Sequence, residues 1–137
     1  MSLPPGWQKL PGGDAGVTFG GPPALGYRPI VAIAHEPFRP ATPAGFADGI
    51  DELRRAQLRE YEGFRLVREW VADVDGRPTH LVTFRWLHAV GELTQVLALV
   101  VVEPGLALQA DGVCLTALES DHLPDIESLV LSIGFAG

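Results

Sequence analysis

The histidines are the first residues to weigh for chemistry, because two of them share one stretch of predicted strand. His80 and His88 have the same parity, so their side chains point to the same face. Eight residues at about 3.3 Å each place them roughly 26 Å apart, whereas a metal bond is about 2 Å long. Two adjacent pairs, His35 with Glu36 and Asp121 with His122, each lack a third metal ligand at a useful spacing. We therefore expect no metal site.

Nucleophilic catalysis has no starting group in this sequence. Cys114 lies between Val113 and Leu115, without a nearby cationic residue to stabilise a thiolate, which is typical of a small core residue. The Gly-x-Ser-x-Gly turn that exposes a catalytic serine is absent around all four serines, Ser2, Ser120, Ser128 and Ser132. Close carboxylates such as Asp48 and Asp51 fall in the first half of a predicted helix, where the helix dipole favours negative charge. We predict no catalytic residue, no cofactor and no enzymatic activity.

The aromatic residues offer more. On one predicted strand, alternation places Phe64, Leu66 and Trp70 on the same face. On the next strand, the residues that share a face are His80, Val82, Phe84, Trp86 and His88. Such faces are usually buried under a helix. The alternative is a partly open groove that holds a peptide, since Trp and Arg are enriched at binding hot spots. The candidate partner-binding residues are Trp70, Arg85 and Trp86.

Composition narrows the partners. The 137 residues suit one domain, and a net charge of −7 argues against binding to nucleic acid or an anionic membrane, which needs Lys and Arg. The five arginines between residues 54 and 68 alternate with glutamates, as on an ion-paired helix face. A single cysteine, no signal peptide and no apolar run of about 18 residues predict a cytoplasmic protein without membrane insertion.

The order of elements predicts an α+β fold. Residues 1–26, rich in Gly and Pro, are expected to form an irregular lead-in whose only strand-like fragment is 17–19, and residues 27–137 a single domain. A short strand at 30–35, a helix at 43–61 and a terminal helix at 122–131, capped by Ser120 or Asp121, surround an antiparallel meander. Its four strands are predicted at 64–73, 79–88, 93–102 and 106–118. The pair Asp111-Gly112 interrupts the last strand as either a bulge or a turn.

Seven consecutive apolar residues, 96–102, form the central feature of this meander. A strand with one wet face would alternate, so both faces of this strand must be covered. We expect the helix at 43–61 on one face, and the helix at 122–131 together with the lead-in on the other. Whether these covers suffice separates a sealed core from a binding surface.

This arrangement resembles the Mog1/PsbP-like fold, and most closely its bacterial DcrB-like and LpqN-like branch. The resemblance covers about residues 27–137 and rests on the order of the elements. The segments that carry it are Ile30–Ile33, the helix pattern Phe46, Leu53, Gln57 and Leu58, then Gly63–Val67, Asp75–His80, Leu93–Val96, Leu115–Ala117 and Ser132–Phe135. It implies a curved antiparallel sheet flanked by helices on both faces, an α/β/α sandwich. It also implies the absence of enzymatic activity and a binding role, as in a regulator of a small GTPase, an auxiliary subunit of photosystem II and dimeric secretion chaperones.

Two functions from different classes follow. The first is a non-catalytic protein-binding module, adaptor or chaperone-like, that holds a protein or peptide partner on a sheet face or edge. A secretion-associated role and a homodimer are options within this hypothesis. The alternative is a domain that binds a small hydrophobic ligand in a pocket between sheet and helix.

Overall fold

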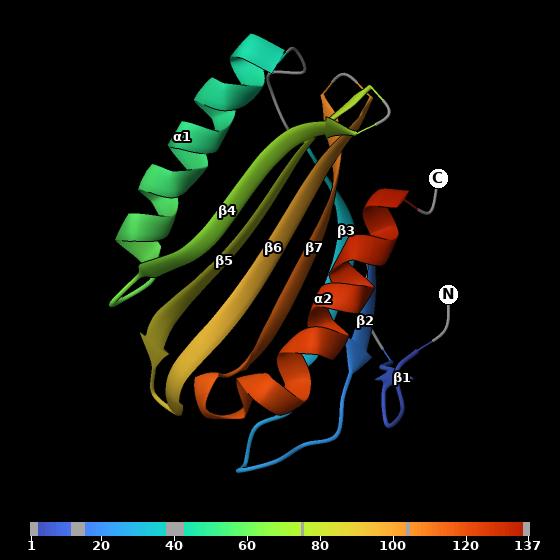
Figure 1. Ribbon diagram of the computed structural model, residues 1–137, viewed down its shortest axis with the longest axis vertical. Helices are drawn as coiled ribbons and strands as arrows, with labels where there is room; N and C mark the ends of the chain where they lie inside the picture. The colour runs from blue at the N-terminus through green and yellow to red at the C-terminus, as the bar shows by residue number, and fades with distance from the viewer. Residues whose placement is uncertain (1–2, 12–15, 38–42, 75, 104, 136–137) are drawn as a thin grey trace.

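The computed structural model describes residues 3–11, 16–37, 43–74, 76–103 and 105–135. These residues form a seven-stranded antiparallel sheet with α1 (Pro43–Glu60) on one side and α2 (Glu119–Phe135) on the other, as Figure 1 shows. The strand order is β1-β2-β3-β7-β6-β5-β4. The strands are β1 (Gln8–Lys9), β2 (Gly16–Gly20), β3 (Ile30–Pro37), β4 (Arg65–Val74), β5 (Arg77–His88), β6 (Gly91–Glu103) and β7 (Leu106–Leu115).

The predicted meander is confirmed, with β4 to β7 paired in sequence order. Two of its hairpin turns contain a glycine in the left-handed region, Gly76 at φ 79° and Gly105 at φ 82°. Residues with a Cβ rarely adopt this conformation, and a tight turn between antiparallel strands requires it. The α+β sandwich expected from the sequence is therefore the observed architecture.

The lead-in is more regular than predicted. Residues 8–9 and 16–20 are the strands β1 and β2, and β2 pairs with β3 from Gly16 opposite Ala34 to Gly20 opposite Ile30. The sequence suggested only a strand-like fragment at 17–19, because glycine and proline runs bracket it. Pairing with β3 extends the strand, since the neighbour satisfies backbone groups that the local sequence leaves free.

The pair Asp111-Gly112 is neither a bulge nor a turn, so both alternatives were wrong. Both residues lie within β7, paired with β3 on one side and β6 on the other without a register shift. A Cβ on Gly112 would stand 2.3 Å from Cγ2 of Ile126 in α2. The glycine therefore marks the close approach of a helix to the sheet. The register shifts occur elsewhere, between Leu66 and Arg68 and between Val101 and Glu103.

The terminal helix begins earlier than predicted. A short 3-10 turn, Thr116–Leu118, leads directly into α2 at Glu119, which already has helical angles of φ −54° and ψ −42°. Ser120 and Asp121 therefore lie within the first helical turn, and their prediction as caps was wrong. A cap needs a residue outside the helical conformation, and the 3-10 turn removes the extended backbone at that point.

The apolar run of β6 is covered on both faces, as predicted. On one face Leu99 and Val101 pack with Ile50 of α1, and Leu53 lies against the same cluster. On the other, Val96 and Ala98 belong to a larger cluster that includes three residues of α2, Ile126, Leu129 and Val130. Trp7 of the lead-in completes that second cluster, and its indole Nε1 donates to Oδ2 of Asp125 at 3.3 Å.

Candidate functional site

The three predicted partner-binding residues do not converge. Trp86 faces the α1 side, where its ring lies 4.9 Å from that of Tyr61. Arg85, the preceding residue, faces α2 and makes two hydrogen bonds to the Glu119 carboxylate, at 2.9 and 3.0 Å. Trp70 lies on β4 with 43% of its surface exposed. The three residues therefore cannot line one groove.

The bulge in β4 explains why Trp70 departs from the predicted face. Leu66 pairs with Phe84, but Trp70 pairs with Leu81, because the register shifts between Leu66 and Arg68. Phe84 and Leu81 are an odd number of residues apart, so they point to opposite sides of β5. The expected common face of Leu66 and Trp70 was therefore wrong. On β5 itself the predicted face holds, with Phe84 fully buried and packed against Tyr61 and Phe64.

The open edge at β4 is the most exposed apolar element of the sheet. Among the described residues β4 pairs with β5 alone, so its other side is an unpaired strand edge, seen in Figure 1 between the two helices. Four of its large hydrophobic residues are 43 to 52% exposed: Leu66, Val67, Trp70 and Val71. A ten-residue edge strand of this kind presents free N–H and C=O groups to a further strand.

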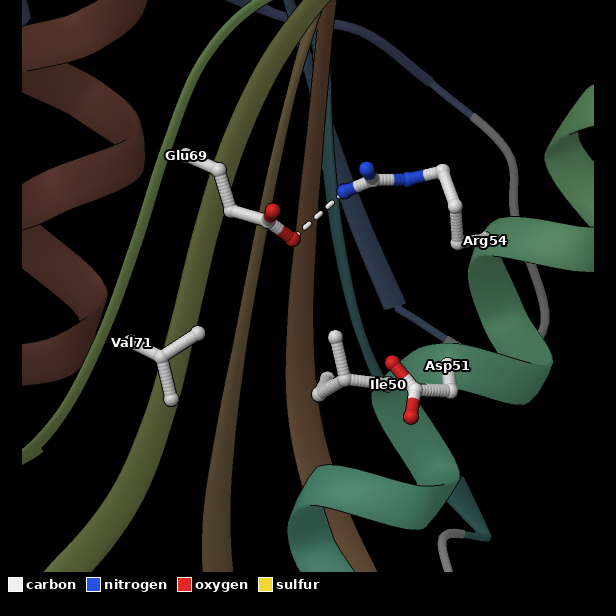
Figure 2. A pocket seen from close by; sticks show the side chains of 5 residues that line it. All are labelled: Ile50, Asp51, Arg54, Glu69 and Val71. Atoms are coloured by element: carbon white, nitrogen blue, oxygen red, sulfur yellow. Dashed lines mark hydrogen bonds and ion pairs between the residues drawn. The ribbon is translucent and has the colours of Figure 1, made fainter.

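A cleft of about 230 Å³ lies between α1 and β4, lined by Ile50, Asp51, Arg54, Glu69 and Val71 (Figure 2). Arg54 Nη2 of α1 is 2.5 Å from Oε2 of Glu69. His80 Nε2, on the neighbouring strand, is 2.7 Å from the same oxygen. The contact between Arg54 and Glu69 joins α1 to β4, and the contact from His80 joins β5 to the same carboxylate.

Burial and mutual contacts set the protonation states of His80 and Glu69. Burial lowers the pKa of His80 by more than the Glu69 hydrogen bond raises it, so the ring is neutral at pH 7 and its Nε2–H donates to the carboxylate. Burial acts to raise the pKa of Glu69, but the hydrogen bond from His80 and the charge of Arg54 hold it below its usual range. Glu69 is therefore ionised and already paired, which leaves it unsuited to acid–base work.

A second hollow of about 450 Å³ lies at the end of the sheet where β5 turns into β6. Its lining includes Leu25, Val90, Glu92, Leu115 and Ala117. Leu25 is 75% exposed and has a φ of 52°, a conformation that side chains with a Cβ rarely adopt. The hollow is wide and open, and it is not the space between sheet and helix in which a ligand pocket was predicted.

Groups for metal or nucleophilic chemistry do not come together in the described part of the chain. No cluster of three His, Cys, Asp or Glu side chains there could hold a metal ion. Cys114 is buried in the α2-side core, as predicted, and burial raises the pKa of its thiol to about 12. The thiol is therefore neutral and unreactive at neutral pH. Among the described helices, none is both long and apolar enough to cross a membrane.

The sequence pattern did not identify Asp111 as a polar group on the α1 side. Asp111 of β7 accepts a hydrogen bond at 2.7 Å from Nε2 of Gln95, whose Oε1 accepts from the indole of Trp86 at 2.9 Å. Burial raises the pKa of Asp111 from 3.8 to about 6. The Asp-Gly pair resembles a turn in the sequence and hides this role. The available signal was parity, since Gln109 and Asp111 place polar side chains on one face of a buried strand.

Comparison with solved structures gives a common fold. The chain is similar to LpqN of Mycobacterium tuberculosis, described as involved in cell envelope biogenesis, with 18% identity, a TM-score of 0.66 and coverage of 94% of this chain and 77% of that one. It is similar to the cyanobacterial PsbP of Synechocystis, with 12% identity, a TM-score of 0.62 and coverage of 95% and 81%. It is also similar to PA94 of Pseudomonas aeruginosa, a candidate regulator of unknown function, with 18% identity, a TM-score of 0.64 and coverage of 90% and 76%.

These likenesses define the class of the protein by fold. The chain has the Mog1/PsbP-like fold that its sequence resembles, with the sheet between two helices. Neither models of protein families nor curated proteins match the sequence. The likeness therefore describes architecture, and the function must be argued from the side chains.

Proposed function

We propose that the protein is a non-catalytic protein-binding module that adds an extended, hydrophobic segment of another protein to its sheet at β4. The observation that carries this proposal is the unpaired ten-residue strand with four exposed large hydrophobic residues. A sheet edge gives affinity through main-chain hydrogen bonds and specificity through contacts to alternate side chains. An adaptor or a chaperone would use such an edge.

The two sides of β4 offer different contacts to such a segment. Trp70 lies on the α2 side of the strand, and Val71 on the α1 side beside the cleft lined by Ile50 and Arg54. Successive side chains of an added strand would alternate between these two sides. The cleft, smaller than the roughly 300 Å³ at which ligand pockets begin, suits one apolar side chain better than a separate ligand. This size favours a protein partner over the small-ligand alternative.

The cellular setting belongs to the same proposal. We place the protein in the cytoplasm, on the single cysteine and the acidic composition. LpqN, a structural neighbour, is described by its part in cell envelope biogenesis, which makes the envelope the competing location. Fractionation of cells that produce the tagged full chain distinguishes the two.

Strand addition is tested with N-methylated peptides. The probes are fluorescein-labelled decapeptides of alternating Val and Thr that are unmethylated, methylated at every second backbone amide, or methylated at every backbone amide. A methylated amide cannot donate a hydrogen bond, and successive amides point to opposite edges of a strand, so the half-methylated peptide keeps one edge that can pair with β4 and the fully methylated peptide keeps none. Fluorescence anisotropy is expected to show binding of the unmethylated and half-methylated peptides, with at least about a tenfold loss for the fully methylated one.

Variants locate the contact. Val71→Lys is expected to weaken binding of the peptide, and Val90→Lys, which alters an equally exposed valine in the hollow at the sheet end, is the matched control. Equal binding of the unmethylated and the fully methylated peptide, or equal loss in both variants, contradicts addition at β4. Light scattering measures the oligomeric state and so tests whether a second copy of the chain occupies the β4 edge instead. A dimer that dissociates only in Val71→Lys would show that a second copy of the chain fills the edge, against the proposal.

A further inference from the structure

The carboxylate of Asp111 lies in the middle of the α1-side face. Its backbone pairs with Ala32 on β3 and with Leu97 on β6. This row separates two apolar clusters, one formed by Ile50 with Leu99, Val101 and Ala107, and one formed by Leu93, Val113 and Leu115. A single charge is therefore placed between two hydrophobic patches of the sheet.

No cation in the described residues neutralises this charge. The ion pairs among them involve Glu69, Glu92, Glu119 and Glu127, and none includes Asp111. Its one hydrogen-bond donor among these residues is Gln95. A charged carboxylate withdrawn from water without a charged partner is costly, and carboxylates with pKa values raised in this way are frequent at functional sites.

The surroundings of Asp111 are ordered and aromatic. The Gln95 side chain, 3% exposed, cannot reverse its amide without losing both the indole donor of Trp86 and its own bond to the carboxylate. Tyr61 lies with its ring 4.9 Å from Trp86 and 5.1 Å from Phe84. Burial first and then the charge of Asp111 raise the pKa of Tyr61, and the same charge contributes to the raised pKa of Tyr27. Both phenols are therefore within electrostatic reach of the carboxylate.

Access to the carboxylate is preserved. Asp111 itself is half-buried, as are Tyr27, Tyr61 and Leu97. Ala32, directly across from Asp111 on β3, places only a methyl group beside it. The contacts of α1 described above fall on Leu99, Val101 and Ala107, to one side of this row.

We propose that Asp111, with Tyr27, Tyr61 and Trp86 around it, binds an alkylammonium group, carried by a free organic amine or by a lysine side chain. An ammonium supplies the positive charge that the carboxylate lacks, and aromatic rings attract cations through their electron-rich faces. A neutral ligand of the same shape gains neither interaction. The site lies apart from the β4 edge, so its occupancy and strand addition can be tested separately.

The experiment follows binding by two-dimensional NMR, using the side-chain signals of Gln95 and the indole N–H of Trp86. The probes are n-butylammonium, its neutral isostere n-butanol, and Nα-acetyl-lysine methylamide. We expect n-butylammonium to shift both signals and n-butanol to leave them unchanged. Equal affinity for the two amines would indicate that a free amine suffices, and tighter binding of the lysine derivative would indicate a peptide-borne group. Shifts of equal size with n-butanol, or no shift with either amine, overturn the proposal.

Two comparisons assign the binding to Asp111. Asp111→Asn is expected to weaken binding of n-butylammonium at least about tenfold, whereas Asp73→Asn, an exposed acid on β4, should leave it unchanged. Unaltered affinity in Asp111→Asn contradicts the proposal. The second comparison is the pH dependence of binding, which is measured on the unaltered protein and so does not depend on the folding of a variant.

The affinity for n-butylammonium should also decrease as the pH is lowered. The elements against Asp111 place Ile30, Ala32 and Ala34 of β3 and Gln95 and Leu97 of β6 on its side of the sheet, none of them titratable. Tyr27 and Tyr61 remain neutral below pH 10, since their pKa values are raised. With a pKa of about 6, Asp111 is mostly protonated at pH 5, and binding should be about tenfold weaker there than at pH 7.5. A constant affinity over this range contradicts the assignment.

Discussion

The two faces of the sheet are built on different principles. On the α2 side the helix approaches so closely that Gly112 has no room for a Cβ, and Ile126 fills the space above it. Arg85 is paired there through two hydrogen bonds to Glu119, whereas the buried Nδ1 of His122 in α2 has no hydrogen-bond partner among the described residues. On the α1 side, the helix covers one cluster around Ile50, and the neighbouring surface holds a half-buried carboxylate.

The two faces therefore contribute differently to stability and to function. A tightly packed face contributes to the free energy of folding and tolerates little change. A face with a charge between apolar clusters reduces that free energy, and departures of this kind from stable packing are expected at functional sites. The α2 side is therefore the structural face, and the α1 side with the β4 edge carries both proposed binding functions.

The largest effect that would sharpen this contrast is expected at Gly112. Gly112→Ala places a Cβ 2.3 Å from Cγ2 of Ile126 and should cost about 2 to 3 kcal/mol of stability in urea unfolding. Ala32→Val, on the half-buried α1 side of β3, should cost less than about 1 kcal/mol. In a double-mutant cycle, Ile126→Ala should relieve part of the Gly112→Ala cost. Strictly additive effects would mean that the helix is not in tight contact at this point.

An effect of opposite sign is expected at Asp111. Because its folded-state pKa of about 6 lies above the ordinary 3.8, the folded state holds its proton more strongly than the unfolded state. This group therefore lowers stability as the pH rises from about 4 through about 6. Asp111→Asn should raise the free energy of unfolding by about 1 to 2 kcal/mol at pH 8 and change it little at pH 4. Urea unfolding at the two pH values measures this, and a loss of stability at pH 8 would show that the carboxylate is structural.

The smallest effect is expected on the edge strand. Trp70→Ser and Val71→Thr alter residues that are 43% and 52% exposed, so each should change stability by no more than about 0.5 kcal/mol. Thermal unfolding followed by circular dichroism checks this. A larger loss in either variant would mean that the residue belongs to the core of the isolated chain, and the edge would then lose its standing as a binding surface.

The sequence was informative where local patterns decide the outcome. The run at 96–102 predicted a strand covered on both faces, and Leu99 and Ala98 do belong to opposite clusters. The alternation from His80 to His88 placed the aromatic residues of β5 on one side correctly. These features depend on residues close in the chain, whose periodicity is visible without knowledge of the fold.

The candidate sites were less accessible from the sequence. A shift of one residue in the pairing of β4 moved Trp70 to the face opposite Leu66, and no local signal marks such a bulge. Arg85 looked free because its partner Glu119 lies 34 residues away. In the same way, the local sequence of the Asp111-Gly112 pair indicates a bulge or a turn, whereas pairing with β3 and β6 on either side keeps it within a regular strand.

Local patterns along the chain are enough to predict the α+β class, the order of the meander, the burial of its central strand on both faces and the resemblance to the Mog1/PsbP-like fold. Long-range contacts decide three further features: the lead-in joins the sheet, β4 pairs on one side alone among the described residues, and Asp111 has no cationic partner within that part of the chain. The physical reason is the range of the interactions. Burial patterns repeat every two or three to four residues, whereas strand register, edge exposure and charge pairing depend on groups far apart in the chain.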